Sequence, residues 1–187
     1  MTSIADKPWV HNSIWYALIA WGLTLSTIPF GAIANDAPSL LPVLLYLIFL
    51  PIAAFTFIAL ILSVVSYPTT ERFLRRLLHL YLALILVFAT TYFWIVVAAD
   101  FSELAIYGVH SPWQYLPGAE GRQWHANFAA LTAVDCFHYS CVTITTLGFG
   151  DMHPVHWFPK LVTDVEVLSG VTIVAVGLGR FFARNDP

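Results

Sequence analysis

The chain has 187 residues, of which 59% are hydrophobic and only 10% are charged. Soluble domains carry about 25% charged residues, so this composition excludes a water-covered surface and indicates a membrane protein of about one domain. The sequence has no basic patch, which argues against a nucleic-acid partner. It also has no nucleophile–base arrangement and no metal-ligand spacing, so we expect neither enzyme activity nor a cofactor.

Four apolar segments are each longer than the ~20 residues that cross a bilayer core. They are residues 13–33, 40–66, 73–99 and 157–184. The first is longer than the usual 7–15 residues of a signal-peptide core, so we interpret it as a membrane helix. The sequence therefore predicts an all-α membrane fold, with a two-helix segment over residues 1–70 and a second unit over residues 71–187.

The basic residues predict the orientation of these helices. With both termini in the cytoplasm, six of the eight Lys and Arg residues lie on the inner side, as the positive-inside rule requires: Lys7, Arg72, Arg75, Arg76, Arg180 and Arg184. We therefore expect a multi-pass protein of the cell membrane with cytoplasmic termini. Residues 100–150 then lie on the outer side or re-enter the membrane from it.

Residues 127–144, NFAALTAVDCFHYSCVTI, have the pattern of a helix that is too short and too polar to span. A short helix between two spanning helices, followed by glycines, is typical of a re-entrant loop. Backbone without helical hydrogen bonds is tolerated at membrane depth only where protein buries it or where it lines a water-filled path. We therefore expect the segment after this helix to line such a path.

Glycines stand at alternate positions in that segment, Gly148 and Gly150. An ordinary strand points successive carbonyls in opposite directions, whereas alternation of right- and left-handed residues turns them to one side, and glycine adopts the left-handed form cheaply. The result would be a row of carbonyl oxygens above the Thr146 hydroxyl. One row cannot surround an ion, but four rows around an axis can replace the water shell of K⁺. We expect a symmetric tetramer with Asp151 at the outer mouth, where it attracts cations.

The stretch TITTLGFGD, residues 143–151, resembles the signature of the potassium channel family, T-x-x-T-T-V-G-Y-G-D with tolerated variants. The resemblance covers about 100 residues and leaves residues 1–70 outside it. It implies a pore domain over residues 71–187. Its parts are an outer helix (73–99), an outer turret (100–126), a pore helix (127–144), a selectivity-filter strand (145–151) and an inner helix (157–184).

The resemblance also implies roles for single residues. The filter would comprise Thr146, Leu147, Gly148, Phe149 and Gly150, of which the first four bind K⁺ as a permeating ion. The side chains of Leu147 and Phe149 would point backward into packing. Gly170, twenty residues after Gly150, matches the gating glycine of the inner helix. The implied function is passive K⁺ conduction by a homotetramer in a lipid bilayer.

The sequence departs from the family pattern at the pore helix, where many members have two aromatic residues and this chain has His138 and Tyr139. Phe149 lacks the hydroxyl of the usual filter tyrosine. His138 could reach Asp151, so we expect external protonation of His138 to alter that contact and the open probability. A histidine packed as an aromatic ring is the alternative.

Other interpretations remain open. A weakly selective cation channel, a non-conducting accessory membrane protein and a haem-binding four-helix protein are alternatives to a potassium channel. The outer histidines could form a zinc or proton site, although no ligand spacing is evident. Of Asp164 and Glu166, which cannot share a helix face, one is expected to bond the pore helix rather than an ion.

Overall fold

The computed structural model describes residues 15, 18–19, 21–22, 73–99, 105–115 and 122–185. Three helices dominate these residues: α4 (Phe73–Ala98), α5 (Ala126–Ile144) and α6 (Trp157–Asn185). Their ends lie within one residue of the predicted helices 73–99, 127–144 and 157–184. The structure describes only five residues of the predicted spanning segment 13–33 and none of the segment 40–66. The prediction that both termini are cytoplasmic also lies outside the described residues.

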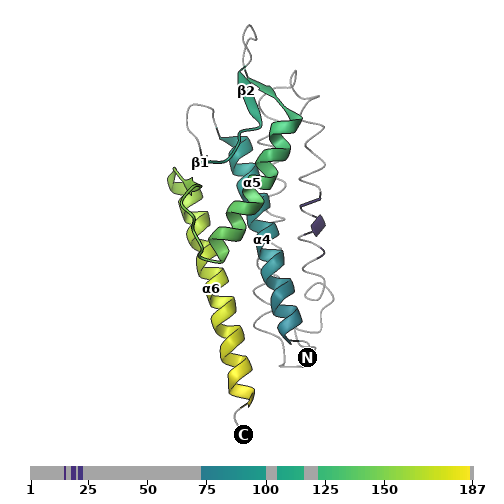
Figure 1. Ribbon diagram of the computed structural model, residues 1–187, viewed down its shortest axis with the longest axis vertical. Helices are drawn as coiled ribbons and strands as arrows, with labels where there is room; N and C mark the ends of the chain where they lie inside the picture. Colours follow the sequence, from purple (N-terminus) through teal and green to yellow (C-terminus); the bar gives the residue numbers. More distant parts are fainter. Residues whose placement is uncertain are drawn as a thin grey trace, which may run out of the picture.

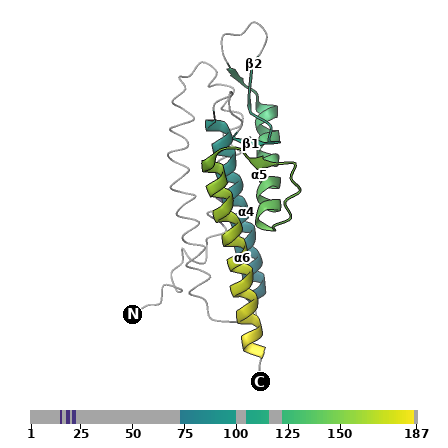
Figure 2. The ribbon, with the colours of Figure 1, turned by 90° about the vertical axis from the view of Figure 1, so that its left-hand side faces the viewer.

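The helices α4 and α6 run side by side in opposite directions, with the shorter α5 inclined against them (Figures 1 and 2). Each of the three helices packs on the other two. The chain descends along α5 to a point beside α6 and then returns upward to the start of α6 (Figure 1). Residues 126–157 therefore descend and return between two long helices, and their re-entry into a membrane stays a prediction.

Two described helices are long and apolar enough to cross a membrane, Leu77–Ala98 and Trp157–Gly179. In the most apolar part of each span, 72% of the first is buried within the chain and only 22% of the second, so α4 is more central than α6. Two threonine hydroxyls of α4 bond within the helix: Thr90 and Thr91 donate to carbonyls four residues earlier, at 2.8 and 2.9 Å. This back-bonding lets threonine lie in an apolar helix without an unmet donor.

Aromatic side chains fill the centre where the three helices meet. Tyr92 of α4 and Tyr139 of α5 pack edge to face with their ring centroids 4.8 Å apart. Near the outer end of α4, the indole N–H of Trp113 donates to the Val97 carbonyl at 3.0 Å, and Trp113 packs edge to face on Trp124. The indole group thus ties this part of the chain to α4 and still satisfies its only donor.

The part of the chain that the sequence predicts to lie on the outer side, which we call the outer segment, contains short strands that the all-α prediction did not include. Strand β1 (Ile106–Tyr107) pairs antiparallel with β4 (His153–Pro154), and β2 (Trp113–Tyr115) pairs with β3 (Arg122–Trp124). Two-residue strands carry little periodicity, so a pattern search cannot detect them. The first pair joins residues before α5 to residues after it, and it closes the loop that contains Gly148 and Gly150.

Residues 105–110, which we call the outer clasp, hold this loop by backbone contact. The Val155 N–H donates to the Ala105 carbonyl at 3.0 Å, and the rings of Tyr107 and His153 stack with centroids 4.9 Å apart. Gly108 has a φ of +83°, and a Cβ there would lie 2.4 Å from the Asp151 carbonyl oxygen. Only glycine combines a left-handed φ with room for this close approach, so Gly108 lets the clasp pack directly on the loop.

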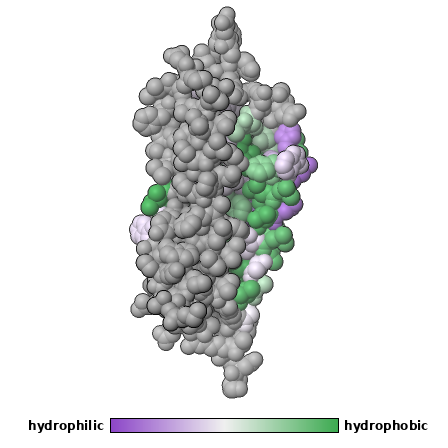
Figure 3. Space-filling model, turned by 180° about the vertical axis from the view of Figure 1, so that it is seen from behind, coloured by the Kyte–Doolittle hydropathy of each residue, from purple (hydrophilic) through white to green (hydrophobic). Residues whose placement is uncertain are grey.

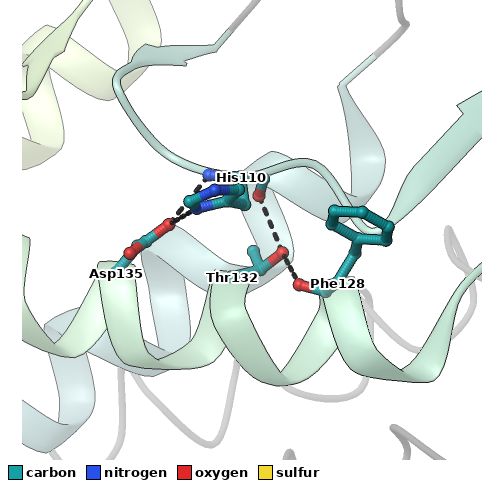
Figure 4. Close-up of polar contacts among 4 residues, drawn as sticks. All are labelled: His110, Phe128, Thr132 and Asp135. Carbon is teal, nitrogen blue, oxygen red and sulfur yellow. Dashed lines mark hydrogen bonds and ion pairs between the residues drawn. The ribbon is translucent and has the colours of Figure 1, made fainter.

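The clasp ends at His110, which bonds to the outer half of α5 (Figure 4). The backbone N–H of His110 donates to Oδ2 of Asp135 at 2.9 Å, and its ring Nδ1 lies 2.6 Å from the same oxygen. The Thr132 hydroxyl lies 2.7 Å from the His110 carbonyl and 2.8 Å from the Phe128 carbonyl. The clasp therefore connects α5 to the loop that follows it.

We predict that Asp135→Ala lowers the free energy of unfolding by about 1 kcal/mol. The loss is moderate because the pair is partly exposed, but one backbone N–H also loses its acceptor. The thermal midpoint of purified protein in detergent measures the change. Val134→Ala is the control, because Val134 is the preceding residue and is 64% exposed. Equal midpoints for the two variants would contradict this role of Asp135.

Candidate functional site

The C-terminal end of α5 leads directly into the candidate site. A helix leaves its last four carbonyls without a partner, yet here all four accept a bond. Cys141 accepts from Thr145 N–H (3.3 Å), Val142 from Leu147 N–H (3.0 Å) and Thr143 from Thr146 N–H (2.9 Å). The fourth carbonyl, of Ile144, accepts from the Tyr81 hydroxyl of α4 at 2.8 Å. The helix end is thus fixed by its own chain.

The bonds from Thr146 to Thr143 and from Leu147 to Val142 form a Schellman motif. This motif needs a left-handed residue, and Thr146 supplies it with a φ of +58°. Glycine usually stands there, because the left-handed form costs other residues about 1–2 kcal/mol. Threonine at this position retains a hydroxyl, which donates to the Thr145 carbonyl at 2.7 Å and leaves the lone pairs of its oxygen free.

Left-handed residues recur at every second position after α5. The φ values are +58° at Thr146, +49° at Gly148 and +82° at Gly150. The sequence predicts the two glycines, whereas nothing in it signals the left-handed threonine. The segment is not a β-strand as expected, because a strand needs extended dihedrals throughout. The left-handed φ values at both glycines agree with the glycine spacing, and the common direction of the carbonyls that this spacing predicts stays a prediction.

This segment lies on an open face of the chain. A Cβ built on Gly148 or Gly150 would meet no atom within 4 Å. Leu147 and Phe149 are 63% and 66% exposed, so their predicted packing into the interior is not met within one chain. The reason is that the sequence places the segment directly after α5, which contacts it from one side. Nothing among the described residues covers the other side.

Behind the segment, a carboxyl group joins the three helices. Glu166 of α6 is fully buried. Its Oε2 accepts a bond from the Tyr92 hydroxyl of α4 at 2.6 Å, and its Oε1 bonds to the Ser140 hydroxyl of α5. This bears out the expectation that one of the two acids in the inner helix bonds the pore helix. The other, Asp164, is exposed.

The sequence model of a family described as ion channel matches residues 80–185, more than half of the chain. The chain belongs to the ion channel family. No match was found among curated proteins or among solved structures. The matched residues of this channel include most of α4, all of α5, the segment with alternating hands and α6.

At the outer end of the segment, the structure agrees with the second of the two interpretations of His138, a histidine packed as an aromatic ring. The His138 ring lies parallel to that of Phe149, with centroids 6.2 Å apart and an interplanar angle of 6°. No hydrogen bond joins His138 to Asp151 within the described residues. Asp151 is exposed and accepts from the Met152 N–H at 3.1 Å. His138 therefore contacts the site through an aromatic ring, and a pH response through Asp151 stays a prediction.

Gly170 lies where α6 touches the end of α5. A Cβ at this position would lie 2.6 Å from Cγ1 and 2.9 Å from the carbonyl oxygen of Ile144. The channel therefore needs glycine here for close approach of the two helices. The helix α6 continues through this position without a break. A hinge at Gly170, which the family resemblance implies, stays a prediction.

The described part of the channel contains no group of three or more His, Cys, Asp or Glu residues that could hold a metal ion. His110 pairs with Asp135, and His153 stacks on Tyr107. The zinc site considered for the outer histidines thus finds no support in these residues. Cys136 and Cys141 are both free.

We predict that Gly170→Ala destabilises the channel by about 1–3 kcal/mol, because the added methyl group overlaps a backbone oxygen that cannot move aside. Gly179→Ala on the same helix is the control. A Cβ there meets nothing within 4 Å, and alanine gains up to about 1 kcal/mol of helix propensity. Thermal midpoints in detergent should move in opposite directions. If both midpoints moved in the same direction, helix propensity and not the contact with Ile144 would determine the effect of Gly170→Ala.

Proposed function

We propose that the chain forms a homotetrameric potassium-selective channel in the cell membrane, with residues 146–150 as the selectivity filter. The observation that carries this proposal is the alternation of left-handed residues at Thr146, Gly148 and Gly150 on an open face of an ion channel chain. Such backbone presents carbonyl oxygens in a row. Rows from four chains around an axis can replace the hydration shell of K⁺.

The exposure of the segment supports assembly of several chains. Non-helical backbone at membrane depth has to be buried in protein or line a water path, and one chain buries only one side of it. Copies of the same segment on the open side would cover Leu147 and Phe149 and enclose the carbonyl row. The exposed apolar residues of α5 and α6 then meet lipid or neighbouring subunits (Figure 3). They include Leu131, Val134, Leu161, Leu168 and Val171.

The lower end of the filter would use a side chain. The Thr146 hydroxyl already donates its proton to the Thr145 carbonyl, so its oxygen is available as an acceptor for a cation. At the outer end, the exposed carboxylate of Asp151 would raise the local concentration of cations. Both features favour cation conduction over anion conduction.

A weakly selective cation channel is the second candidate, and one observation favours it. Phe149 stacks on His138 of the pore helix and lacks the hydroxyl with which a tyrosine would form a hydrogen bond. A filter braced by stacking alone resists widening less than one braced by a directional bond. The two candidates differ in the ratio of Na⁺ to K⁺ permeability.

We expect purified protein in planar bilayers, with K⁺ on one side and Na⁺ on the other, to show a reversal potential far from zero, with the sign that selective K⁺ permeation gives. Gly148→Val is the control, because a β-branched residue cannot adopt the left-handed φ of this position without strain. It should abolish the current. A reversal potential near zero would establish the weakly selective alternative, and the absence of any current would exclude both.

We further predict that Thr146→Gly separates stability from conduction. Glycine removes the left-handed strain, so the thermal midpoint should stay constant or rise, with a gain of up to about 1 kcal/mol. The hydroxyl is lost, so K⁺ selectivity should fall. Thr146→Ser keeps the hydroxyl and should conduct like the wild type. Unchanged selectivity in Thr146→Gly would show that this hydroxyl does not bind the ion.

A further inference from the structure

The buried carboxyl of Glu166 has no basic partner among the described residues. Its helix, Trp157–Gly179, is one of the two candidate membrane spans, and the side chain is fully buried. The ion pair that the structure describes, His110–Asp135, lies elsewhere. An unpaired charge at such a position is costly, so acids in membrane helices face partners or water. The neighbours of Glu166 are hydroxyl groups, which supply a fixed number of protons.

Each hydroxyl group has one proton, so each can donate only one hydrogen bond. Thr163 donates to the Pro159 carbonyl at 2.8 Å, so the Tyr139 hydroxyl, 3.0 Å away, donates to Thr163. Tyr92 lies 3.3 Å from the Thr163 oxygen and 2.6 Å from Glu166, so its proton points to the carboxyl group. One oxygen of Glu166, Oε2, thus acts as an acceptor.

The other oxygen of Glu166 faces Ser140, which has one proton and two partners. The Ser140 hydroxyl lies 3.0 Å from the Ile85 carbonyl of α4 and also contacts Oε1 of Glu166. If Glu166 were ionised, one of these two contacts would lack a proton. If Glu166 carries a proton, it donates to Ser140, Ser140 donates to Ile85, and every contact is a hydrogen bond.

We propose that Glu166 is a protonated acid that donates to Ser140 and thereby positions the pore helix behind the filter. This inference rests on the proposed function only where it concerns the filter. Glu166 joins α6 to both other helices through Ser140 and Tyr92. One helical turn further along α6, Gly170 contacts Ile144. These two adjacent contacts set the height of the last two turns of α5, and therefore of Thr146, relative to α6.

The test compares Glu166→Gln with Glu166→Leu in the full-length channel. Glutamine has an N–H₂ that donates to Ser140 and an oxygen that accepts from Tyr92, so it reproduces the protonated acid and should keep the K⁺/Na⁺ permeability ratio and thermal midpoint. Leucine cannot bond, and the ratio should fall by roughly tenfold, the equivalent of one buried hydrogen bond. Ser140→Ala should change the ratio in the same direction if Glu166→Leu does not fold.

Infrared spectroscopy provides a readout that does not depend on conduction. The wild type should show the carbonyl band of a protonated carboxylic acid, which disappears in Glu166→Gln and persists in the control Asp164→Asn. Absence of this band in a selective channel would overturn the proposal and leave the function intact. Loss of selectivity in Glu166→Gln as large as in Glu166→Leu would also overturn it. If neither the wild type nor any variant conducts, the proposed channel function is wrong. The infrared band of the carboxylic acid and the thermal midpoints still decide whether Glu166 is protonated and bonds Ser140.

Discussion

Every feature of the site depends on one constraint, that a non-helical backbone segment is supported from one side only. Residues 145–150 have open space on one face, so their position is determined by the end of α5 and by what holds that end. The last four carbonyls of α5 are all bonded, one of them to Tyr81 of the neighbouring helix. The outer clasp holds the other end of the loop through Gly108 and the β1–β4 pair. The segment is thus fixed at both ends, and between them it contacts α5 through the Gly148 N–H, which donates to the Val142 carbonyl at 3.3 Å, and through the stack of Phe149 on His138.

The left-handed threonine follows from this constraint. The same residue ends a helix and begins the row of alternating conformations, so its φ serves the helix cap and the site at once. Strain of this kind persists only where the surroundings over-determine it, and it concentrates at functional positions. Here the N–H groups of Thr146 and Leu147 both donate hydrogen bonds to carbonyls of α5. These bonds offset the cost of the left-handed φ of Thr146. A glycine would satisfy the cap without supplying a side-chain oxygen.

The sequence predicts what depends on local pattern and misses what depends on distant contact. Apolar length and flanking polar residues predict α4, α5 and α6 to within one residue, and the spacing of Gly148 and Gly150 predicts alternating hands. The outer clasp was not predictable, because His110 and Asp135 are 25 residues apart and lie on elements with no shared periodicity. The partners of Glu166 were equally hidden, since Tyr92 lies 74 residues away. A buried acid indicates that a partner exists but not which one.

The departures from the family pattern have a common physical explanation in the packing behind the segment. His138 and Tyr139 stand where two aromatic residues are usual, and Phe149 has no hydroxyl, so a bond at the level of the segment itself is missing. In this chain Tyr139 instead turns inward to bond Thr163, next to the cluster of Glu166, Ser140 and Tyr92. In this chain the directional bonds therefore lie on the helix that precedes the segment. Because a helix is stiff over two turns, bonds placed there still fix the height of Thr146.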